Sequence, residues 1–169
     1  SLSVDEIGEI CKFVKEINPN CICYVDNCYG EFTDTKEPIE VGADIIAGSL
    51  IKNPGGGIAP TGGYIVGRKD LVELASYRTN SPGMGAELGA SLANNRLLFQ
   101  GLFLAPHVVA QAVKSAIFAA AFFDLLGFKT LPAPDTKRND IIQAIEMGSK
   151  EKLVAFCQGI QKYSPVDSY

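Results

Sequence analysis

The chain has 169 residues, of which 47% are hydrophobic and 20% are charged, and this composition is typical of a globular domain. Nineteen acidic residues outnumber 15 basic ones and give a formal charge of −4 at pH 7, so the charge does not favour nucleic acid as a partner. Five cysteines at irregular spacing accompany a single histidine, which predicts reduced thiols in a cytoplasmic protein and neither a disulfide framework nor a metal site.

The first half of the chain alternates between an amphipathic segment and short apolar runs. Ser3 followed by Glu6 is a capping box, and apolar residues then recur at helical spacing until Asn18-Pro19. In chain order the pattern predicts a helix over 3–17, strands over 21–25, 43–51 and 64–66, and a helix over 70–77 that Asp70 caps. This alternation indicates an α/β layer. Three strands leave exposed edges, so we expect the chain to be part of something longer.

The second half begins with residues 85–128, which are mainly Ala, Leu, Phe and Val without a period of two. They predict two buried helices separated near Ala105-Pro106. Polar residues interrupt the stretch before the roughly 20 clean apolar residues that a bilayer requires, so no membrane span is expected. Prolines within 131–135 indicate a boundary, followed by an extended piece and a helix from about Ser149. The expected domains are 1–130 and 131–169.

Asp26 and Lys52 are the strongest candidates for chemistry, because each follows a predicted strand at its carboxyl end. Open α/β sheets place ligands and reacting groups at that edge. The spacing suggests that the two strands are neighbours. Both residues also fit a structural role, since Asp often caps turns and loop lysines are usually solvated. The pattern alone leaves both interpretations open.

Three segments carry a resemblance to a known family: YVDNCYGEF (24–32), ADIIAGSLIKNPGGG (43–57) and GGYIVGR (62–68). They resemble the pyridoxal-phosphate enzymes of cysteine and methionine metabolism, and most closely the methionine gamma-lyase-like branch, often labelled aluminium resistance protein. The resemblance implies an α/β fold, namely part of the large cofactor-binding domain of a fold type I (aspartate aminotransferase-like) enzyme, over residues 1–130. Residues 131–169 would then begin a C-terminal α+β domain.

The same resemblance implies a role for each of three residues. Lys52 would form a Schiff base with the aldehyde of pyridoxal 5'-phosphate, Asp26 would pair with the pyridine nitrogen, and Ser49 would donate its hydroxyl to the phosphate. The chemistry suits these residue types, because a carboxylate keeps the ring nitrogen protonated and the ring can then accept electron density from a carbanion. A lysine near a cationic ring and out of bulk water is expected to lose part of its preference for the charged form.

The resemblance therefore predicts a carbon–sulfur lyase that acts by beta or gamma elimination on a cysteine-, cystathionine- or methionine-like amino acid, as a cytoplasmic homodimer or homotetramer. The fragment alone is expected to be inactive, because the upstream phosphate-binding turn and the downstream carboxylate-binding arginine of such enzymes have no counterpart here. Lys52 and Asp26 would serve equally in an aminotransferase or aldolase. A non-catalytic oligomerisation domain built on the apolar helices is the alternative from another class.

Overall fold

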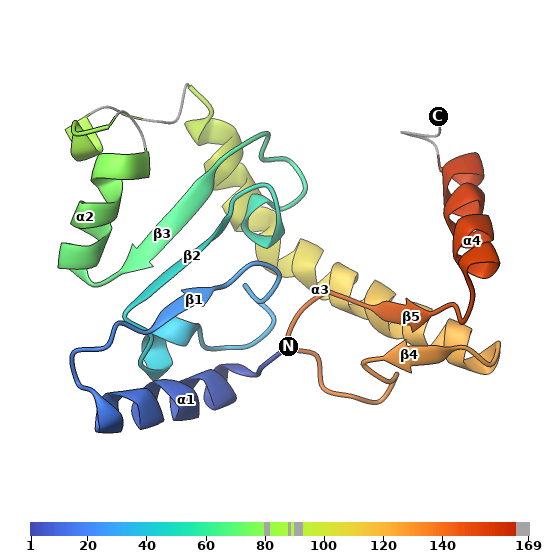
Figure 1. Cartoon of the computed structure of the whole chain (residues 1–169). Helices are drawn as coiled ribbons and strands as arrows, with labels where there is room; N and C mark the ends of the chain where they lie inside the picture. The colour runs from blue at the N-terminus through green and yellow to red at the C-terminus, as the bar shows by residue number, and fades with distance from the viewer. Residues whose placement is uncertain (80–81, 88, 90–92, 165–169) are drawn as a thin grey trace. The chain divides into compact units, whose positions relative to one another are not determined.

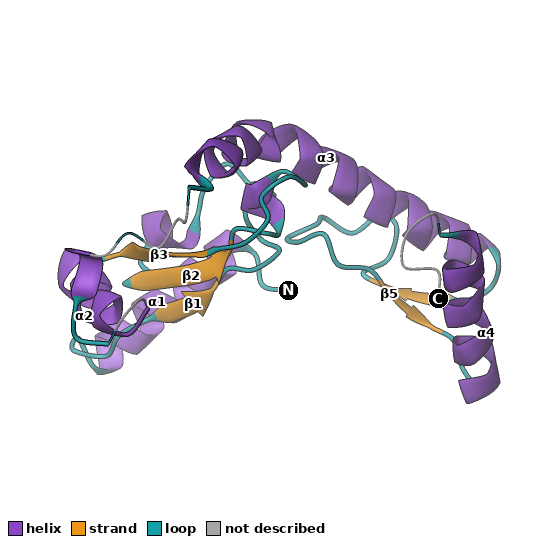
Figure 2. Ribbon diagram, turned by 90° about the horizontal axis from the view of Figure 1, so that it is seen from above, coloured by secondary structure: helices purple, strands orange, loops and turns teal. Residues whose placement is uncertain are grey.

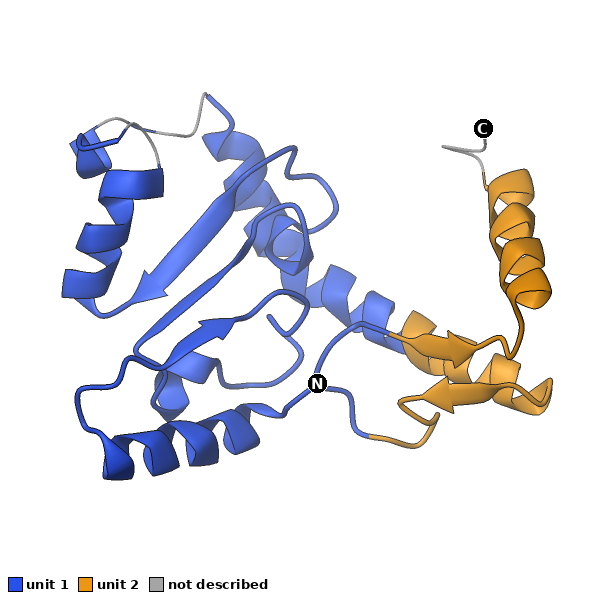
Figure 3. Ribbon diagram, in the orientation of Figure 1, with its two compact units in different colours: residues 1–114, 137–142 blue, residues 115–136, 143–169 orange. Residues whose placement is uncertain are grey.

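The structure is a computed structural model that describes residues 1–79, 82–87, 89 and 93–164. The chain divides into two compact units: unit 1 comprises residues 1–114 and 137–142, and unit 2 comprises 115–136 and the residues from 143 onward (Figure 3). The predicted division after residue 130 stays a prediction about the domains of a longer protein.

Unit 1 holds most of the secondary structure (Figure 1). In chain order its elements, with 3-10 helices labelled η, are α1 (Val4–Ile17), β1 (Tyr24–Asp26), η1 (Pro38–Val41), β2 (Ile45–Ser49), η2 (Asn53–Gly55), β3 (Gly63–Gly67), α2 (Lys69–Thr79), η3 (Gly85–Glu87) and the first part of α3 (Asn95–Leu125). Unit 2 holds the end of α3, β4 (Lys129–Leu131), β5 (Ala144–Glu146) and α4 (Lys150–Tyr163).

Helix α1 begins as the sequence predicts. The Ser3 hydroxyl accepts a hydrogen bond from the Glu6 backbone N–H, and the Glu6 carboxylate accepts one from the Ser3 backbone, so the capping box is confirmed. The helix turns Cys11 inward, where it packs with Cys23 and Ile46 in the core of unit 1. This core holds α1 against the start of the sheet.

The three strands of unit 1 lie side by side in the order β1-β2-β3 (Figure 2). Strand β1 runs parallel to β2, with Asp26 opposite Ala47. Strand β3 runs antiparallel to β2, with Ser49 opposite Gly63. Because β1 and β2 are parallel, their carboxyl ends lie at the same edge of the sheet. The predicted adjacency of the strands that precede Asp26 and Lys52 is therefore confirmed.

The opposite edge of the sheet is held by Asp44, just before β2. Its carboxylate lies 2.6 Å from Lys15 Nζ and 3.2 Å from Arg68 Nη1, and it accepts the Cys23 backbone N–H at 2.8 Å. The contact with Lys15, together with these other donors, lowers the pKa of Asp44 to about 2. Arg68 also pairs with Asp70, which lies in the first turn of α2 and does not cap it.

Residues 95–125 form one helix, α3, and not two: the predicted break at Ala105-Pro106 is wrong. Proline removes one hydrogen bond to the carbonyl four residues before it, here that of Leu102. The helix nevertheless continues through Pro106, so the loss of this one hydrogen bond does not end it.

The prediction that α3 is buried is also wrong for this chain. In its most apolar 18-residue window only 17% of the residues are buried, and Phe103 is 84% exposed. By length and composition α3 would suffice to cross a membrane, a test that the core helices of soluble proteins also pass. The expectation that the protein has no membrane partner stays a prediction.

Unit 2 is organised around a two-stranded sheet and two helical segments. Strands β4 and β5 pair antiparallel, with Thr130 opposite Ile145. Helix α4 begins at Lys150 after Ser149, whose hydroxyl accepts the Lys152 backbone N–H. The rings of Phe123 in α3 and Phe156 in α4 meet edge to face at 5.7 Å. The extended piece and the helix predicted from Ser149 are thus present.

Candidate functional site

The predicted site residues gather at the carboxyl ends of β1 and β2. Asp26 is the last residue of β1, Ser49 is the last of β2, and Lys52 follows Ser49 by one turn. The Asp26 carboxylate accepts the Cys28 backbone N–H at 3.1 Å. Asp26 therefore caps the turn after β1, which is the structural role that the sequence analysis left open for it. This bond lowers the pKa of Asp26, and the nearby charge of Lys52 lowers it further. Asp26 is therefore an exposed, ionised carboxylate close to the lysine.

Lys52 lies against the loop that follows β1. Its ammonium sits 4.2 Å from the centre of the Tyr29 ring, in cation–π range. Interaction with the Tyr29 side chain, and then with Cys28, raises the pKa of Lys52 above its ordinary value. The expectation that this lysine loses part of its preference for the charged form concerns the amine beside a bound cationic ring, and it stays a prediction. In the chain without that ring, the groups described near the amine are the Tyr29 phenol, the Cys28 thiol and the Asp26 carboxylate.

Ser49 shapes the turn that leads to Lys52. Its hydroxyl oxygen accepts the Ile51 backbone N–H at 3.4 Å, and its carbonyl accepts the Lys52 backbone N–H at 3.4 Å. The side chain is half-buried at the sheet edge. Since the hydroxyl oxygen acts only as acceptor in this contact, its hydrogen can be donated to an anion.

A buried polar network lies beside these residues, and the sequence analysis did not predict it. Its members, all with polar side chains, come from the loop after β1, from β3 and from η2: Asn27, Glu31, Glu37, Asn53 and Tyr64. Because polar residues in loops are usually exposed to solvent, the sequence alone did not indicate that these side chains are buried. Gly48 is the one trace in the sequence, because a Cβ there would lie 2.6 Å from both the Glu31 carboxylate and the Tyr64 hydroxyl.

The segment after Lys52 is pressed against α3. A Cβ on Gly56 would lie 2.3 Å from the Gly101 carbonyl oxygen, and a Cβ on Gly101 would lie 2.3 Å from the Gly55 carbonyl oxygen. Such distances leave no space for a side chain on either partner. The glycines at 55, 56 and 101 therefore let α3 fix the backbone that follows Lys52.

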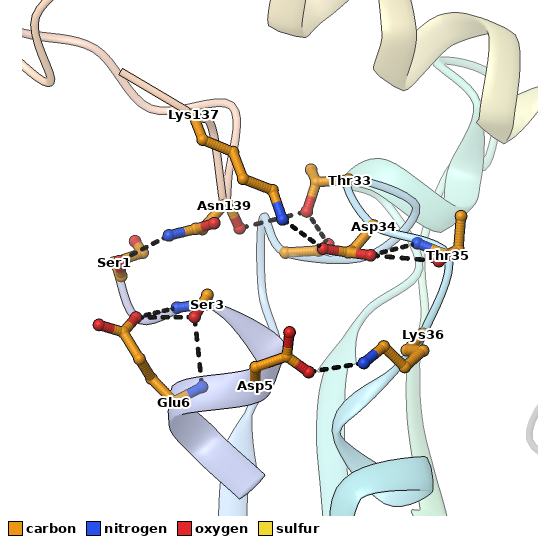
Figure 4. A network of polar contacts seen from close by, with 11 residues as sticks. Ser1, Ser3, Asp5, Glu6, Thr33, Asp34, Thr35, Lys36, Lys137 and Asn139 are labelled. Atoms are coloured by element: carbon orange, nitrogen blue, oxygen red, sulfur yellow. Dashed lines mark hydrogen bonds and ion pairs between the residues drawn. The ribbon is translucent and has the colours of Figure 1, made fainter. Parts of the chain in front are cut away.

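The loop after β1 is also fastened from the other side. Lys137 Nζ lies 3.0 Å from the Asp34 carboxylate, and the Thr33 hydroxyl donates to the Asn139 carbonyl at 3.2 Å (Figure 4). Lys36 reaches back to Asp5 in the first turn of α1 at 2.6 Å. Residues 137–142 are thereby part of unit 1 although they follow unit 2 residues in the sequence.

A cavity of about 580 Å³ lies between α1 and β1. Asp26 and Cys28 line its rim, together with apolar residues such as Ile7, Val14 and Val25. Neither Lys52 nor Ser49 lines it, so this cavity does not join the three predicted site residues. Among the residues that the structure describes, no three His, Cys, Asp or Glu side chains are grouped so that they could hold a metal ion.

Comparison with known proteins gives the chain a family. The methionine gamma-lyase family profile matches residues 1–169. "Uncharacterized protein YnbB" of Bacillus subtilis (strain 168) is 55% identical over 169 residues, which are 100% of this chain and 40% of YnbB.

Solved structures agree in both sequence and fold. A "carbon-sulfur lyase involved in aluminum resistance" from Clostridium novyi NT has a TM-score of 0.94 at 55% identity, and 99% of this chain matches 40% of it. A "putative cystathionine beta-lyase involved in aluminum resistance" from Clostridium acetobutylicum has a TM-score of 0.95 at 55% identity, with the same 99% and 40% covered. The chain thus spans about two fifths of the length of these relatives.

These matches confirm the resemblance that the segments 24–32, 43–57 and 62–68 predicted. They extend from the first residue to the last, and a mixed α/β fold accompanies them. The chain belongs to the methionine gamma-lyase family.

Proposed function

We propose that the chain contributes Lys52, Asp26 and Ser49 to a pyridoxal-phosphate site. The site would belong to a carbon–sulfur lyase of fold type I that acts by beta or gamma elimination. The names of two structural relatives at 55% identity, "carbon-sulfur lyase" and "putative cystathionine beta-lyase", support the reaction class. The observation that carries the proposal is that β1, which ends at Asp26, and β2, which ends three residues before Lys52, are parallel neighbours, and that the charge of Lys52 acts on the Asp26 carboxylate.

The side chains at this edge fit the cofactor. A carboxylate with a lowered pKa suits a protonated pyridine nitrogen, a lysine amine suits an aldehyde, and a serine hydroxyl suits a phosphate ester. When bound, the cofactor withdraws electrons from the α-carbon of an amino acid. Residues outside this chain would complete the phosphate and carboxylate contacts.

Each residue then has a defined task. Asp26 holds a proton on the ring nitrogen because its carboxylate stays ionised. Ser49 donates its hydroxyl hydrogen to a phosphate oxygen. Lys52 would hold the cofactor through Nζ, and its neutral amine would take a proton from the substrate α-carbon. The described surroundings of Lys52 favour its charged form, so the neutral form would depend on the environment that the bound group creates.

Chemical trapping tests the assignment. The protein is expressed from its complete gene, supplied with pyridoxal phosphate, reduced with borohydride and mapped by mass. We expect a pyridoxyl group on Lys52 and none on Lys12, an exposed lysine of α1 that serves as the control. An unmodified Lys52 would refute the cofactor site and favour a non-catalytic role.

Substitution of the same residue tests the reaction. Lys52→Ala is expected to abolish release of thiol from cystathionine, cysteine or methionine, because both the covalent attachment and the proton transfer are lost. Lys52→Arg keeps the positive charge but has no amine that could form the bond, so it should be equally inactive. Lys12→Ala should retain full turnover. Turnover that survives in Lys52→Ala would show that another residue carries the chemistry.

A further inference from the structure

Asn53, the residue after Lys52, joins the two loops of the site. Its side chain is 5% exposed, and its amide nitrogen donates to the Tyr29 carbonyl and to the Glu31 carbonyl, each at 3.0 Å. The segment that carries Lys52 is thereby fastened to the segment that carries Tyr29. Loss of this amide would leave both carbonyls without the donor.

Glu31 fastens the same loop to the sheet. It is 3% exposed, and its carboxylate accepts the Tyr64 hydroxyl of β3 at 2.8 Å. Tyr64 in turn accepts the Asn27 amide at 3.3 Å, and the same amide donates to Glu37 at 2.9 Å. The second carboxylate oxygen of Glu31 is buried and has no hydrogen-bond partner. Burial of a carboxylate with only one of its oxygens hydrogen-bonded lowers the stability of the fold. None of the tasks proposed for Asp26, Lys52 or Ser49 uses Glu31.

The loop between these contacts is held in an unfavourable conformation. Tyr29 has φ of 73° and Phe32 has φ of 62°, both in the left-handed region that non-glycine residues rarely adopt. Such residues persist when the surrounding contacts determine their geometry, and they cluster at functional sites. Here the contacts of Asn53 and Glu31 enclose Tyr29, whose ring lies under the Lys52 ammonium.

We propose that Asn53 and the Glu31–Tyr64 pair are positioning residues, which hold Tyr29 against Lys52 and thereby set the place of the reactive amine beside Asp26. The proposal rests on the function proposed above, because it concerns the same lysine. None of the three residues touches the reacting atoms. They act through Tyr29 and through the turn between β2 and η2.

The first test uses the protein without cofactor. Lys52 is labelled with an amine-directed reagent over a range of pH, and its rate is compared with that of Lys12 in the same sample. In Asn53→Ala the Tyr29 contact is released, so the pKa of Lys52 should fall and its labelling at pH 8 should rise several-fold. Each unit of fall gives about ten times more neutral amine.

Tyr64→Phe is the milder variant, because it removes one hydroxyl and leaves the ring in place. It should shift Lys52 labelling in the same direction by a smaller factor. Asp44→Asn serves as the matched control: it removes a largely buried charge just before β2, at the edge of the sheet away from the site. Thermal unfolding of all three variants shows how much stability each loses, and Asp44→Asn should leave Lys52 labelling unchanged.

The second test uses the loaded protein. If the amine is displaced by about 1 Å, kcat should fall on the order of 100-fold in Asn53→Ala, and the visible absorbance of lysine-bound cofactor should titrate at a different pH. Asp44→Asn should change neither. Wild-type labelling rates and an unchanged absorbance titration in both site variants would overturn the proposal, and so would changes that merely parallel those of Asp44→Asn. A wild-type protein that fails to trap pyridoxal phosphate at Lys52 would instead refute the proposed function, while labelling of the cofactor-free protein would still report on positioning.

Discussion

Asp26 and Asp44 are both aspartates at strand ends, yet their surroundings give them different roles. Asp44 is enclosed by Lys15, Arg68 and the Cys23 backbone N–H, and its side chain is only 10% exposed. Asp26 is exposed and accepts one backbone N–H. The enclosed carboxylate stabilises the fold, whereas the exposed one remains open to a ligand.

Asp44 makes stability depend on acidity. Its pKa is lowered from 3.8 to about 2, so its contribution is fully present above pH 3.8 and disappears as the pH falls through about 2. Asp44→Asn should lower the free energy of unfolding by about 2 kcal/mol at neutral pH. Urea unfolding at several pH values measures this. A gap between variant and wild type that stayed constant down to pH 2 would contradict the assignment.

Tyr29 controls the acidity of Lys52. Its side chain is the leading cause of the raised pKa, so Tyr29→Phe, which keeps the ring and loses the hydroxyl, should lower the pKa of Lys52 toward the ordinary 10.5. The pH dependence of the lysine side-chain NMR signals checks this. Tyr24→Phe is the control, because Tyr24 is 59% exposed on β1. Equal titration of Lys52 in the two variants would show that the hydroxyl has no influence.

At the scale of the elements, α3 and the loop after Lys52 depend on glycine. Gly→Ala normally stabilises a helix by up to about 1 kcal/mol. At Gly101 the sign should reverse, because the new Cβ would lie 2.3 Å from the Gly55 carbonyl oxygen, and overpacking of this kind costs about 1–3 kcal/mol. Gly159→Ala in α4 meets open space and should stabilise. Thermal unfolding of the two variants should therefore shift in opposite directions, and shifts of the same sign would disprove the close approach.

The helices and strands that local signals define could be predicted from the sequence. Ser3 with Glu6 marked the start of α1, and Ser149 marked that of α4. The polar ends of two apolar runs located Asp26 and Lys52, since buried strands emerge at such residues. The continuity of α3 could not be predicted, because whether a helix tolerates Pro106 depends on the surroundings of the carbonyl that loses its partner and not on local sequence alone.

The site was predictable only in part for a related reason. Asp26, Ser49 and Lys52 were found through a family resemblance and the ends of strands. Glu31 and Tyr64 are 33 positions apart and meet only after β3 has paired with β2. Asn53 likewise bonds to carbonyls more than 20 positions away. Single-sequence patterns report neighbours in sequence, and a buried polar network consists of neighbours in space.

At the scale of the whole molecule, α3 carries several strongly exposed aromatic side chains. Phe99, Phe103 and Phe118 are each more than 70% exposed in this chain. Aromatic surface of this extent attracts hydrophobic dyes and other apolar surfaces. We therefore expect the 169-residue chain, prepared alone, to bind the dye ANS strongly and to sediment in a concentration-dependent way.

A matched pair of variants tests this surface. Phe103→Lys should reduce both dye binding and self-association, because it places a charge in the middle of the aromatic residues of α3. Leu74→Lys replaces a residue that is 68% exposed on α2 and should change either property much less. Equal effects of the two substitutions would show that α3 holds no continuous apolar surface.

The pairing of Gly48 with Tyr64 has a consequence for how the sheet assembles. If β3 slipped by one residue along β2, every side chain of β3 would change faces, and the Tyr64 hydroxyl would leave Glu31. The buried carboxylate would then lose its hydrogen-bond donor, and Tyr64 would pair with Ala47 or Ser49, each of which has a Cβ, in place of Gly48. Apolar alternation in a strand of five residues specifies register weakly. The Tyr64–Glu31 hydrogen bond and the missing Cβ at Gly48 both favour the observed alignment. The polar network thus helps to specify the register of β3 on β2. A sheet in another register would lack the Glu31–Tyr64 hydrogen bond and with it part of the site.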